Sequence, residues 1–209
     1  MKILVTAGPT REFIDEVRFL SNPSSGKMGF EVAAASAQAG HETVLVTGPT
    51  AIPDPPRVEV VRITSADEMA EACLSRFSKC DGVVMTAAVC DYRPKKRFKG
   101  KLKKREQNLN LELVQTTDIL AEMGSRKEKQ VLFGFALEAK AVRVNAVSKL
   151  ASKNLDYIVL NSPESFAEDK ISCEIIDRQG RGRRREGISK RKLAREIITI
   201  LENLINGTS

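Results

Sequence analysis

The feature that most constrains this chain is a regular succession of short apolar runs and helical patterns through its first 89 residues. Apolar runs occupy residues 2–8, 41–48, 58–63 and 82–89, and helical patterns occupy 27–39 and 65–77. Runs that are apolar throughout are typical of strands buried on both faces of a parallel sheet. Strands that alternate with helices predict a doubly wound, Rossmann-like α/β fold with a mostly parallel sheet.

The alternation returns in the second half of the chain after a polar interruption. The expected elements are a helix at 118–123, a strand at 130–137, a helix at 141–153, a strand at 156–162 and a late antiparallel hairpin at 172–188. No internal repeat interrupts this pattern, so residues 1–209 are expected to form a single nucleotide-binding α/β domain.

Two helices carry clear end signals. Ser65 and Glu68 form a capping box, and the helix that follows places Met69, Cys73 and Phe77 on one face. The last helix is expected to begin after a Ser189 cap and to end at Gly207. Its expected inward positions are Leu193, Ile197, Leu201 and Leu204.

The net charge of +7 is concentrated in two segments. Residues 93–105 carry nine basic side chains and no acid, and residues 178–192 carry eight basic side chains with Glu186. The rest of the chain therefore has a net charge of −9. The first segment is expected to be a basic β-arm at about 93–115, and the second a solvated part of the C-terminal hairpin.

Several classes of protein are disfavoured by composition. The four cysteines form no C-x-x-C pair and there is one histidine, so no zinc site is expected, no metal-ligating residue is assigned, and a reducing, cytoplasmic setting fits best. No apolar stretch is long enough to cross a membrane, and the N-terminal apolar run is too short for a signal peptide.

The segment "SNPSSGKMG", residues 21–29, has the look of a phosphate-binding loop. It lacks the first glycine and the final Ser or Thr of a Walker loop, and it lacks one glycine of the dinucleotide fingerprint. What remains is a loop of small residues that leads into a helix, where free backbone N–H groups attract anions.

Ligands of such sheets lie beyond the carboxyl ends of the strands, at the switch in strand order. Four loops are expected to meet there: "TAGPTRE", "AAVCDYR", "GFALEA" and "LNSPE". The basic arm directly follows the second of these loops, which favours a nucleoside triphosphate as the ligand.

Five segments of the chain together resemble the phosphopantothenate–cysteine ligase family, also called phosphopantothenoylcysteine synthetase. They are "VTAGPTREFIDEVRFLSNPSSGKMG", "TAAVCDYRP", "GKLKK", "GFALEA" and "SKLASKNLDYIVLN". They follow the family's order from Val5 to Asn161, and the first is highly specific. In many bacteria this family is the synthetase half of a bifunctional coenzyme A biosynthesis flavoprotein. The decarboxylase half has no counterpart here, so no flavin is expected.

The chain departs from the family pattern in a few places. Cys90 stands where alanine is usual, Ala139 stands where threonine is usual, and "SFAEDKIS" replaces a phenylalanine–glycine pattern. These changes bear on substrate details around Glu138 and Asp169 and leave the reaction class untouched.

The resemblance implies CTP-dependent joining of 4′-phosphopantothenate to L-cysteine. The substrate carboxylate attacks the α-phosphorus of CTP, pyrophosphate leaves, and an acyl-cytidylate forms. The cysteine amine then attacks this anhydride and releases CMP. Both steps gather negative charge, so cations, oriented donors and Mg²⁺ are expected as aids, with CTP as co-substrate.

Two residues match the family's catalytic positions. Lys101 is expected to neutralise the triphosphate as pyrophosphate leaves, and Asn22 to hold the acyl-cytidylate carbonyl in the second step. From the residues alone, Lys101 also fits one solvated face of a polar strand. Asn22 likewise fits an ordinary Asn-Pro turn.

The remaining expected site residues divide into two groups. The nucleotide-binding group is Asp91, Thr117, Asp118, Ile119, Leu120, Phe135, Lys149 and Lys153. The substrate-binding group is Ser24, Ser25, Gly26, Lys27, Gly29 and Asn161. Plainer alternatives exist for each: turn formers at strand ends, an ordinary helix start, a core phenylalanine and a solvated pair of lysines.

Two other functions share some of these features. An NAD(P)-dependent oxidoreductase would share the fold class, but the glycine fingerprint is missing. An RNA-binding module would use the basic segments, but with two tyrosines and no tryptophan the stacking platforms are missing, so no nucleic acid is expected. Family members are dimers, which implies a homodimer whose basic arms complete shared active sites. The choice of CTP over ATP is left open by the sequence.

Overall fold

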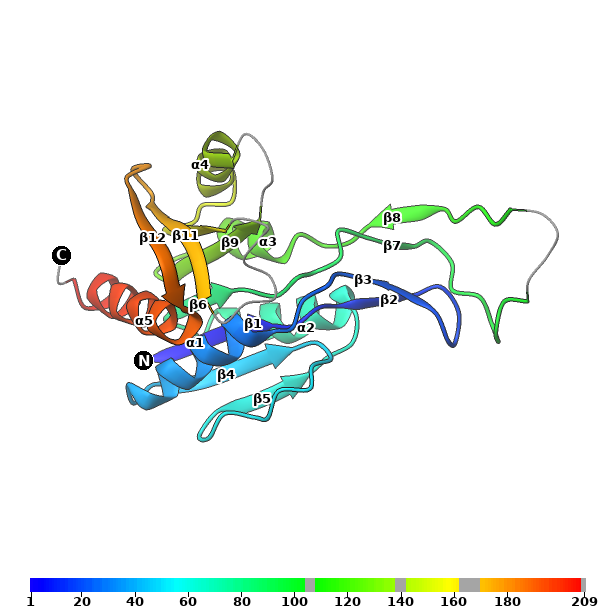
Figure 1. Ribbon diagram of the computed structural model, residues 1–209, viewed down its shortest axis with the longest axis horizontal. Coiled ribbons are helices and arrows are strands. Elements are labelled where there is room, and N and C mark those ends of the chain that lie inside the picture. Colours follow the sequence, from blue (N-terminus) through cyan, green and yellow to red (C-terminus); the bar gives the residue numbers. More distant parts are fainter. Residues whose placement is uncertain (104–107, 138–141, 162–169, 208–209) are drawn as a thin grey trace.

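An eight-stranded sheet forms the centre of the computed structural model, which describes residues 1–103, 108–137, 142–161 and 170–207 (Figure 1). The spatial order of the strands is β12-β11-β10-β9-β6-β1-β4-β5. Their bounds are β1 Lys2–Ala7, β4 Glu42–Thr47, β5 Glu59–Arg62, β6 Gly82–Met85, β9 Val131–Leu137, β10 Tyr157–Asn161, β11 Lys170–Asp177 and β12 Gly182–Ser189. Neighbours from β5 to β10 pair in parallel, whereas β11 and β12 form the antiparallel hairpin. The expected Rossmann-like sheet and C-terminal hairpin are confirmed.

The strand order reverses between β1 and β6, as in a doubly wound sheet. The chain first builds outward from β1 through β4 to β5, and then builds in the other direction through β6, β9 and β10. Loops that follow β1 and β6 therefore diverge at their carboxyl ends, and a crevice opens between them.

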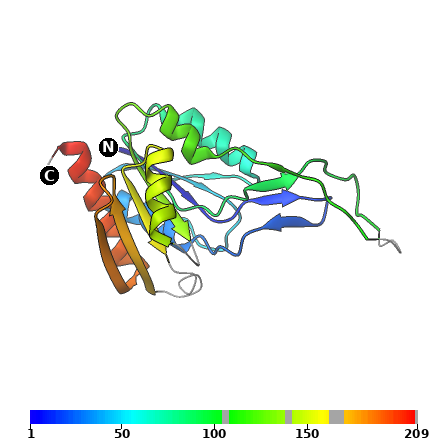
Figure 2. The same ribbon diagram turned by 90° about the horizontal axis from the view of Figure 1, so that it is seen from above.

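Helices cover both faces of the sheet (Figures 1 and 2). The helices α1, Lys27–Gln38, and α5, Lys190–Asn206, share one apolar core with one face of the sheet. The helices α2, Ala66–Phe77, α3, Ile119–Ser125, and α4, Val142–Ser152, contribute to a second core on the opposite face. The central strand β1 is buried from both sides, with Ile3, Leu4 and Val5 fully inaccessible.

The expected helix signals are largely confirmed. Ser65 and Glu68 form the capping box of α2, and Ser189 accepts a bond from the backbone of Lys192 at the start of α5. The expectation for Leu204 is wrong, because its side chain is 42% exposed. The apolar face of α5 continues from Leu201 to Ile205, four residues on, and Ile205 packs against the core in place of Leu204.

Two short antiparallel ribbons extend from the carboxyl end of the sheet (Figure 2). One pairs β7, Tyr92–Pro94, with β8, Leu113–Gln115, and forms the base of the expected basic arm. The other pairs β2, Arg11–Phe13, with β3, Phe19–Ser21, and was not expected from the sequence. Within the described residues, none of the helices combines the length and apolar character needed to cross a bilayer.

Candidate active site

Two adjoining cavities lie at the switch in strand order, beyond the carboxyl ends of β6 and β9. Their volumes are about 160 Å³ for the first and 520 Å³ for the second. Ala87 and Phe135 line both cavities, so a ligand in one lies next to a ligand in the other. This arrangement can hold two reactants side by side.

The first cavity is built around the loop that enters α1. Of the substrate-binding group, its lining contains Ser24, Ser25, Gly26, Lys27 and Asn161. Gly26 precedes α1 with a φ of +79°, and an added Cβ would lie 2.8 Å from the Thr50 side chain. The loop conformation therefore requires glycine. Gly26 has no side chain to cap α1, and the Lys27 N–H donates instead to Ser25 Oγ at 3.4 Å.

Gly29 is placed differently from the other members of its group, because it does not line either cavity. A Cβ there would lie 2.5 Å from Thr86 Oγ1 and 2.6 Å from Ala7 Cβ. The missing side chain lets α1 pack closely on β1 and β6. We therefore interpret Gly29 as a packing glycine that brings the loop into position.

A buried lysine, Lys190, completes the first cavity. It is 6% exposed, and it begins α5 directly after the Ser189 cap. The expectation of a solvated segment at 178–192 holds for most of that segment, but it is wrong for Lys190. Among the described residues lining this cavity, Lys27 and Lys190 are charged and none is acidic. Asn161 Oδ1 is buried there without a hydrogen-bond partner in the described structure.

The second cavity contains the entire expected nucleotide-binding group: Asp91, Thr117, Asp118, Ile119, Leu120, Phe135, Lys149 and Lys153. These residues come from four separate stretches of the chain, which the fold brings to a single hollow. Tyr92, Gln115 and Thr116 at the base of the arm also line it, although the sequence did not single them out.

An ion pair crosses the second cavity. Lys153 Nζ lies 2.7 Å from Asp118 Oδ2, while Asp118 Oδ1 accepts a bond from the Ala121 N–H at the start of α3. Partial burial acts to raise the pKa of Asp118, but the hydrogen bond from Lys153 and the helix N–H groups outweigh it and lower this pKa. The carboxylate therefore stays charged and holds the lysine at the cavity.

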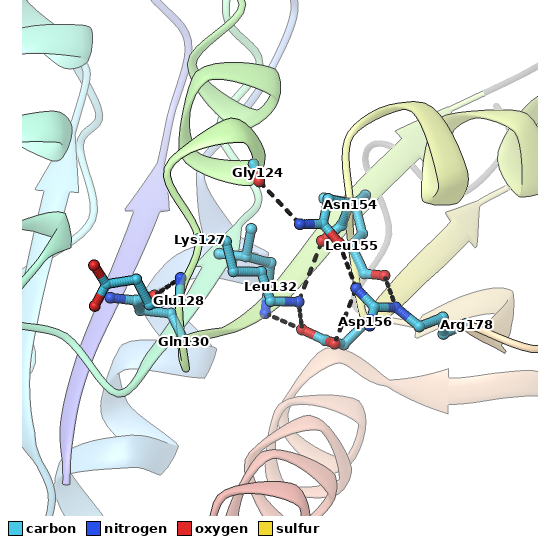
Figure 3. Close-up of polar contacts among 9 residues, drawn as sticks. All are labelled: Gly124, Lys127, Glu128, Gln130, Leu132, Asn154, Leu155, Asp156 and Arg178. Carbon is cyan, nitrogen blue, oxygen red and sulfur yellow. Dashed lines mark hydrogen bonds and ion pairs between the residues drawn. The ribbon is translucent and has the colours of Figure 1, made fainter.

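A polar network lies where the chain passes from α3 and α4 to the amino ends of β9 and β10 (Figure 3). Asp156 Oδ2 pairs with Lys127 Nζ at 2.6 Å and accepts the Leu132 N–H at 2.8 Å. Asn154 Nδ2 donates to the Gly124 carbonyl, 3.0 Å away. The network ties the ends of α3 and α4 to the starts of β9 and β10.

Asn22 lies against the loop that follows β6. Its Nδ2 donates to the carbonyls of Ala88 and Val89, at 3.2 and 3.1 Å. The NH₂ group is therefore bonded to backbone oxygens, and Asn22 does not line either cavity. Its expected role in holding the acyl-cytidylate carbonyl stays a prediction.

Three expected site residues, Lys101, Asn22 and Gly29, do not line either cavity. Lys101 is exposed on the arm. Lys104, Glu138 and Asp169, and the ends of the "GFALEA" and "LNSPE" loops, lie outside the described residues.

Comparisons with known proteins agree with this geometry. The family "DNA/pantothenate metabolism flavoprotein C-terminal domain" matches residues 1–204. The chain belongs to this family. It is 41% identical over 201 residues to the coenzyme A biosynthesis bifunctional protein CoaBC of Bacillus subtilis (strain 168), and covers 50% of that protein. The chain thus spans about half the length of this relative.

Solved structures support the same placement. The crystal structure of the C-terminal domain of a CoaBC protein matches with a TM-score of 0.86 and 38% identity, over 99% of this chain and 96% of that one. A Cab2 mutant in complex with phosphopantothenate-cysteine shares the fold, with a TM-score of 0.80 at 14% identity. The resemblance inferred from the motifs is confirmed.

The Mg²⁺ ion expected from the sequence needs protein groups that can hold it. Among the described residues no group of three or more His, Cys, Asp or Glu side chains could hold one. Mg²⁺ commonly binds through one or two carboxylates together with substrate phosphates. Asp91, at the wall of the second cavity, fits that mode of binding.

Proposed function

We propose that this chain joins 4′-phosphopantothenate to L-cysteine, using CTP, as the synthetase component of coenzyme A biosynthesis. The observation that carries the proposal is the pair of adjoining cavities at the switch point. One is lined by every residue expected to bind nucleotide, and the other combines two lysines with the start of α1. The cavities meet at Ala87 and Phe135, where a carboxylate in one would face an α-phosphorus in the other.

In the first step the substrate carboxylate attacks the α-phosphorus, the bond to the β-phosphate oxygen breaks, and pyrophosphate leaves. Lys149 and Lys153 provide positive charge from within the cavity. Bound Mg²⁺ would neutralise phosphate charge, with Asp91 as the protein group able to hold it. Lys101 adds charge for the departing pyrophosphate.

Because Lys101 stands away from its own cavities, we propose a homodimer in which the arm of one copy reaches the site of the other. Exposed apolar side chains on the two ribbons support this assembly: Val17 is 55% exposed, Phe19 38% and Leu113 43%. Apolar side chains gathered on neighbouring ribbons favour contact with another protein surface.

In the second step the cysteine amine attacks the acyl carbon, and CMP leaves. With its NH₂ group bonded to the Ala88 and Val89 carbonyls, Asn22 has Oδ1 as the group able to meet a ligand. An acceptor at this position can orient the amine by accepting a hydrogen bond from one of its N–H groups. We therefore assign Asn22 to positioning of the nucleophile.

A complementation experiment tests the shared site. Lys101→Gln alone should block pyrophosphate release, and Asn22→Asp alone should form the acyl-cytidylate without converting it to product. If Lys101 comes from the partner copy, mixing the two variants restores one intact site in each mixed dimer, and product formation returns. Absence of recovery in a mixture shown to contain mixed dimers would contradict the shared arrangement.

The two other functions are separated by direct binding. Titration with CTP, NADPH and a single-stranded oligonucleotide in one buffer should show saturable binding of CTP alone. Preferential binding of NADPH or of the oligonucleotide would favour the oxidoreductase or the RNA-binding module instead.

A further inference from the structure

The turn between β2 and β3 holds the segment of the arm that carries Lys101. The turn residues Ile14–Arg18 belong to the long N-terminal motif, yet they line neither cavity. They lie beside residues 98–102 of the arm, with the Phe98 N–H donating to the Ile14 carbonyl at 2.9 Å. The guanidinium of Arg97 lies 4.8 Å from the centre of the Phe13 ring.

Asp15 is the centre of this contact, and its side chain is fully inaccessible. Its Oδ1 accepts the backbone N–H groups of Val17 and Arg18, at 2.8 and 2.7 Å, which shapes the turn. Its Oδ2 accepts the Leu102 N–H at 3.0 Å and the Arg18 guanidinium at 2.9 Å from Nε. Oδ1 therefore bonds within the turn, whereas Oδ2 joins Arg18 of the turn to Leu102 of the arm.

Arg18 closes the contact from the other side. The same guanidinium that pairs with Asp15 donates to the Leu102 carbonyl at 2.7 Å. Both backbone polar groups of Leu102, the residue directly after Lys101, are thus bonded to one ion pair, in which Asp15 is buried and Arg18 is half-exposed. Burial acts to raise the pKa of Asp15, but the bonds from Arg18, Val17 and Leu102 outweigh it and lower this pKa well below its usual range.

We infer that Asp15 is a positioning residue for Lys101. By fixing the N–H and, through Arg18, the carbonyl of Leu102, it sets where the neighbouring lysine leaves the arm. A long, exposed arm otherwise has little to hold its backbone in one place. The inference rests on the proposed role of Lys101. It assigns the turn residues Ile14–Arg18 of the N-terminal motif to positioning of the arm and not to ligand binding.

The test compares Asp15→Asn with Asp177→Asn. An asparagine at 15 replaces one acceptor oxygen by an NH₂ group, which faces donors on Leu102 and Arg18. Asp177 is a matched control because it shapes the β11–β12 turn in the same way: Oδ1 accepts the Gln179 and Arg181 N–H groups, and Oδ2 pairs with Arg181 Nε. It stands far from the arm in the chain and lines neither cavity.

Hydrogen exchange of the full-length chain gives the readout that does not depend on activity. In Asp15→Asn the Leu102 amide should exchange at least about tenfold faster, whereas Asp177→Asn should leave it unchanged. In the same variant, single-turnover pyrophosphate release at saturating CTP and phosphopantothenate should fall by roughly tenfold or more, because a misplaced catalytic group is costly. The KM for phosphopantothenate should stay within about twofold, since neither cavity is touched.

Each outcome decides something. Unchanged exchange at Leu102 overturns the inference, and so does faster exchange with a wild-type rate of pyrophosphate release. If Asp15→Asn does not fold, Arg18→Lys takes its place, because it keeps the charge but cannot hold Asp15 and Leu102 together. A wild-type rate of pyrophosphate release by Lys101→Gln would instead contradict the proposed role of Lys101. The exchange data would still show whether Asp15 holds the Leu102 backbone.

Discussion

Lys153 Nζ and Asp118 Oδ2, 2.7 Å apart, join the residue after α4 to the N-cap of α3 across the candidate nucleotide cavity. The pair places a cation at the cavity and keeps it there before any ligand arrives. A lysine held in this way loses less side-chain entropy when a phosphate binds than a lysine that moves freely.

Lys153→Met is expected to weaken CTP binding by roughly tenfold, the scale of one charge-assisted hydrogen bond. Isothermal titration at two ionic strengths measures this, and the loss should be larger at low salt. Lys129→Met, on the exposed loop before β9, is the control and should bind CTP like the wild type. Equal affinities for Lys153→Met and wild type would remove Lys153 from the site.

Asp118 also caps α3, so its two functions can be separated. Asp118→Ala removes the acceptor for the Ala121 N–H and should lower the free energy of unfolding by about 1 kcal/mol. Asp118→Asn keeps a capping oxygen and should lose less stability, while both variants release Lys153. Urea unfolding monitors the difference, and equal stability losses would show that the cap contributes nothing.

Lys190→Gln is expected to raise the dissociation constant for phosphopantothenate by about tenfold and to leave CTP affinity unchanged. The reason is that Lys190 is buried in the cavity that contains no acidic residue among those described. Lys192→Gln, two residues on and exposed, is the matched control. A shift in CTP affinity instead would assign the first cavity to the nucleotide.

Gly29→Ala tests whether this position serves packing or ligand binding. The added Cβ would meet Thr86 Oγ1, Ala7 Cβ and the Thr6 carbonyl at 2.5–2.7 Å, so α1 has to shift from the sheet. Overpacking of this kind should lower the free energy of unfolding by about 1–3 kcal/mol. Wild-type stability combined with weakened phosphopantothenate binding would show that Gly29 contacts the ligand.

The four cysteines predict a loss of stability at alkaline pH. Burial raises the pKa of Cys73 to about 12 and those of Cys80 and Cys173 to about 11, and it also raises the pKa of Cys90. In the unfolded chain a thiol has a pKa of about 8.5. The contribution of the protonated, buried thiols to the stability of the fold is therefore complete below that pH, and it is lost as the pH rises toward 11–12.

Unfolding by urea at pH 7.5 and pH 10 measures this loss, and the midpoint should be lower at pH 10. Thiol labelling of the native protein at pH 8 should proceed slowly, because all four side chains are buried. Rapid labelling of a cysteine in the folded state would contradict the assignment of inert, buried thiols.

The sheet, its two helical layers and the candidate nucleotide cavity were predictable because their signals are local. Apolar runs and capping residues fix the elements, and the doubly wound arrangement then brings the loops after β1, β6 and β9 together. Asp91 follows β6, Phe135 lies near the end of β9 and Lys153 follows α4, and the place of each of these elements in the fold is known.

Other features depend on tertiary packing and gave weak signals. Strands of three residues, such as β2 and β3, are too short to show a period-two pattern. Lys190 looked like part of a solvated basic segment, and only the start of α5 beside the first cavity buries it. The hydrogen bonds of the Asn22 amide are to two backbone carbonyls more than 60 residues away, so no local pattern could predict them.

Mass spectrometry of the reaction without cysteine tests the central claim most directly. The protein is incubated with phosphopantothenate, Mg²⁺ and CTP, and in parallel with each of the other nucleoside triphosphates. The account predicts an acyl-cytidylate and one equivalent of pyrophosphate with CTP. An acyl phosphate with release of CDP, or no acyl-nucleotide with any triphosphate, would contradict it.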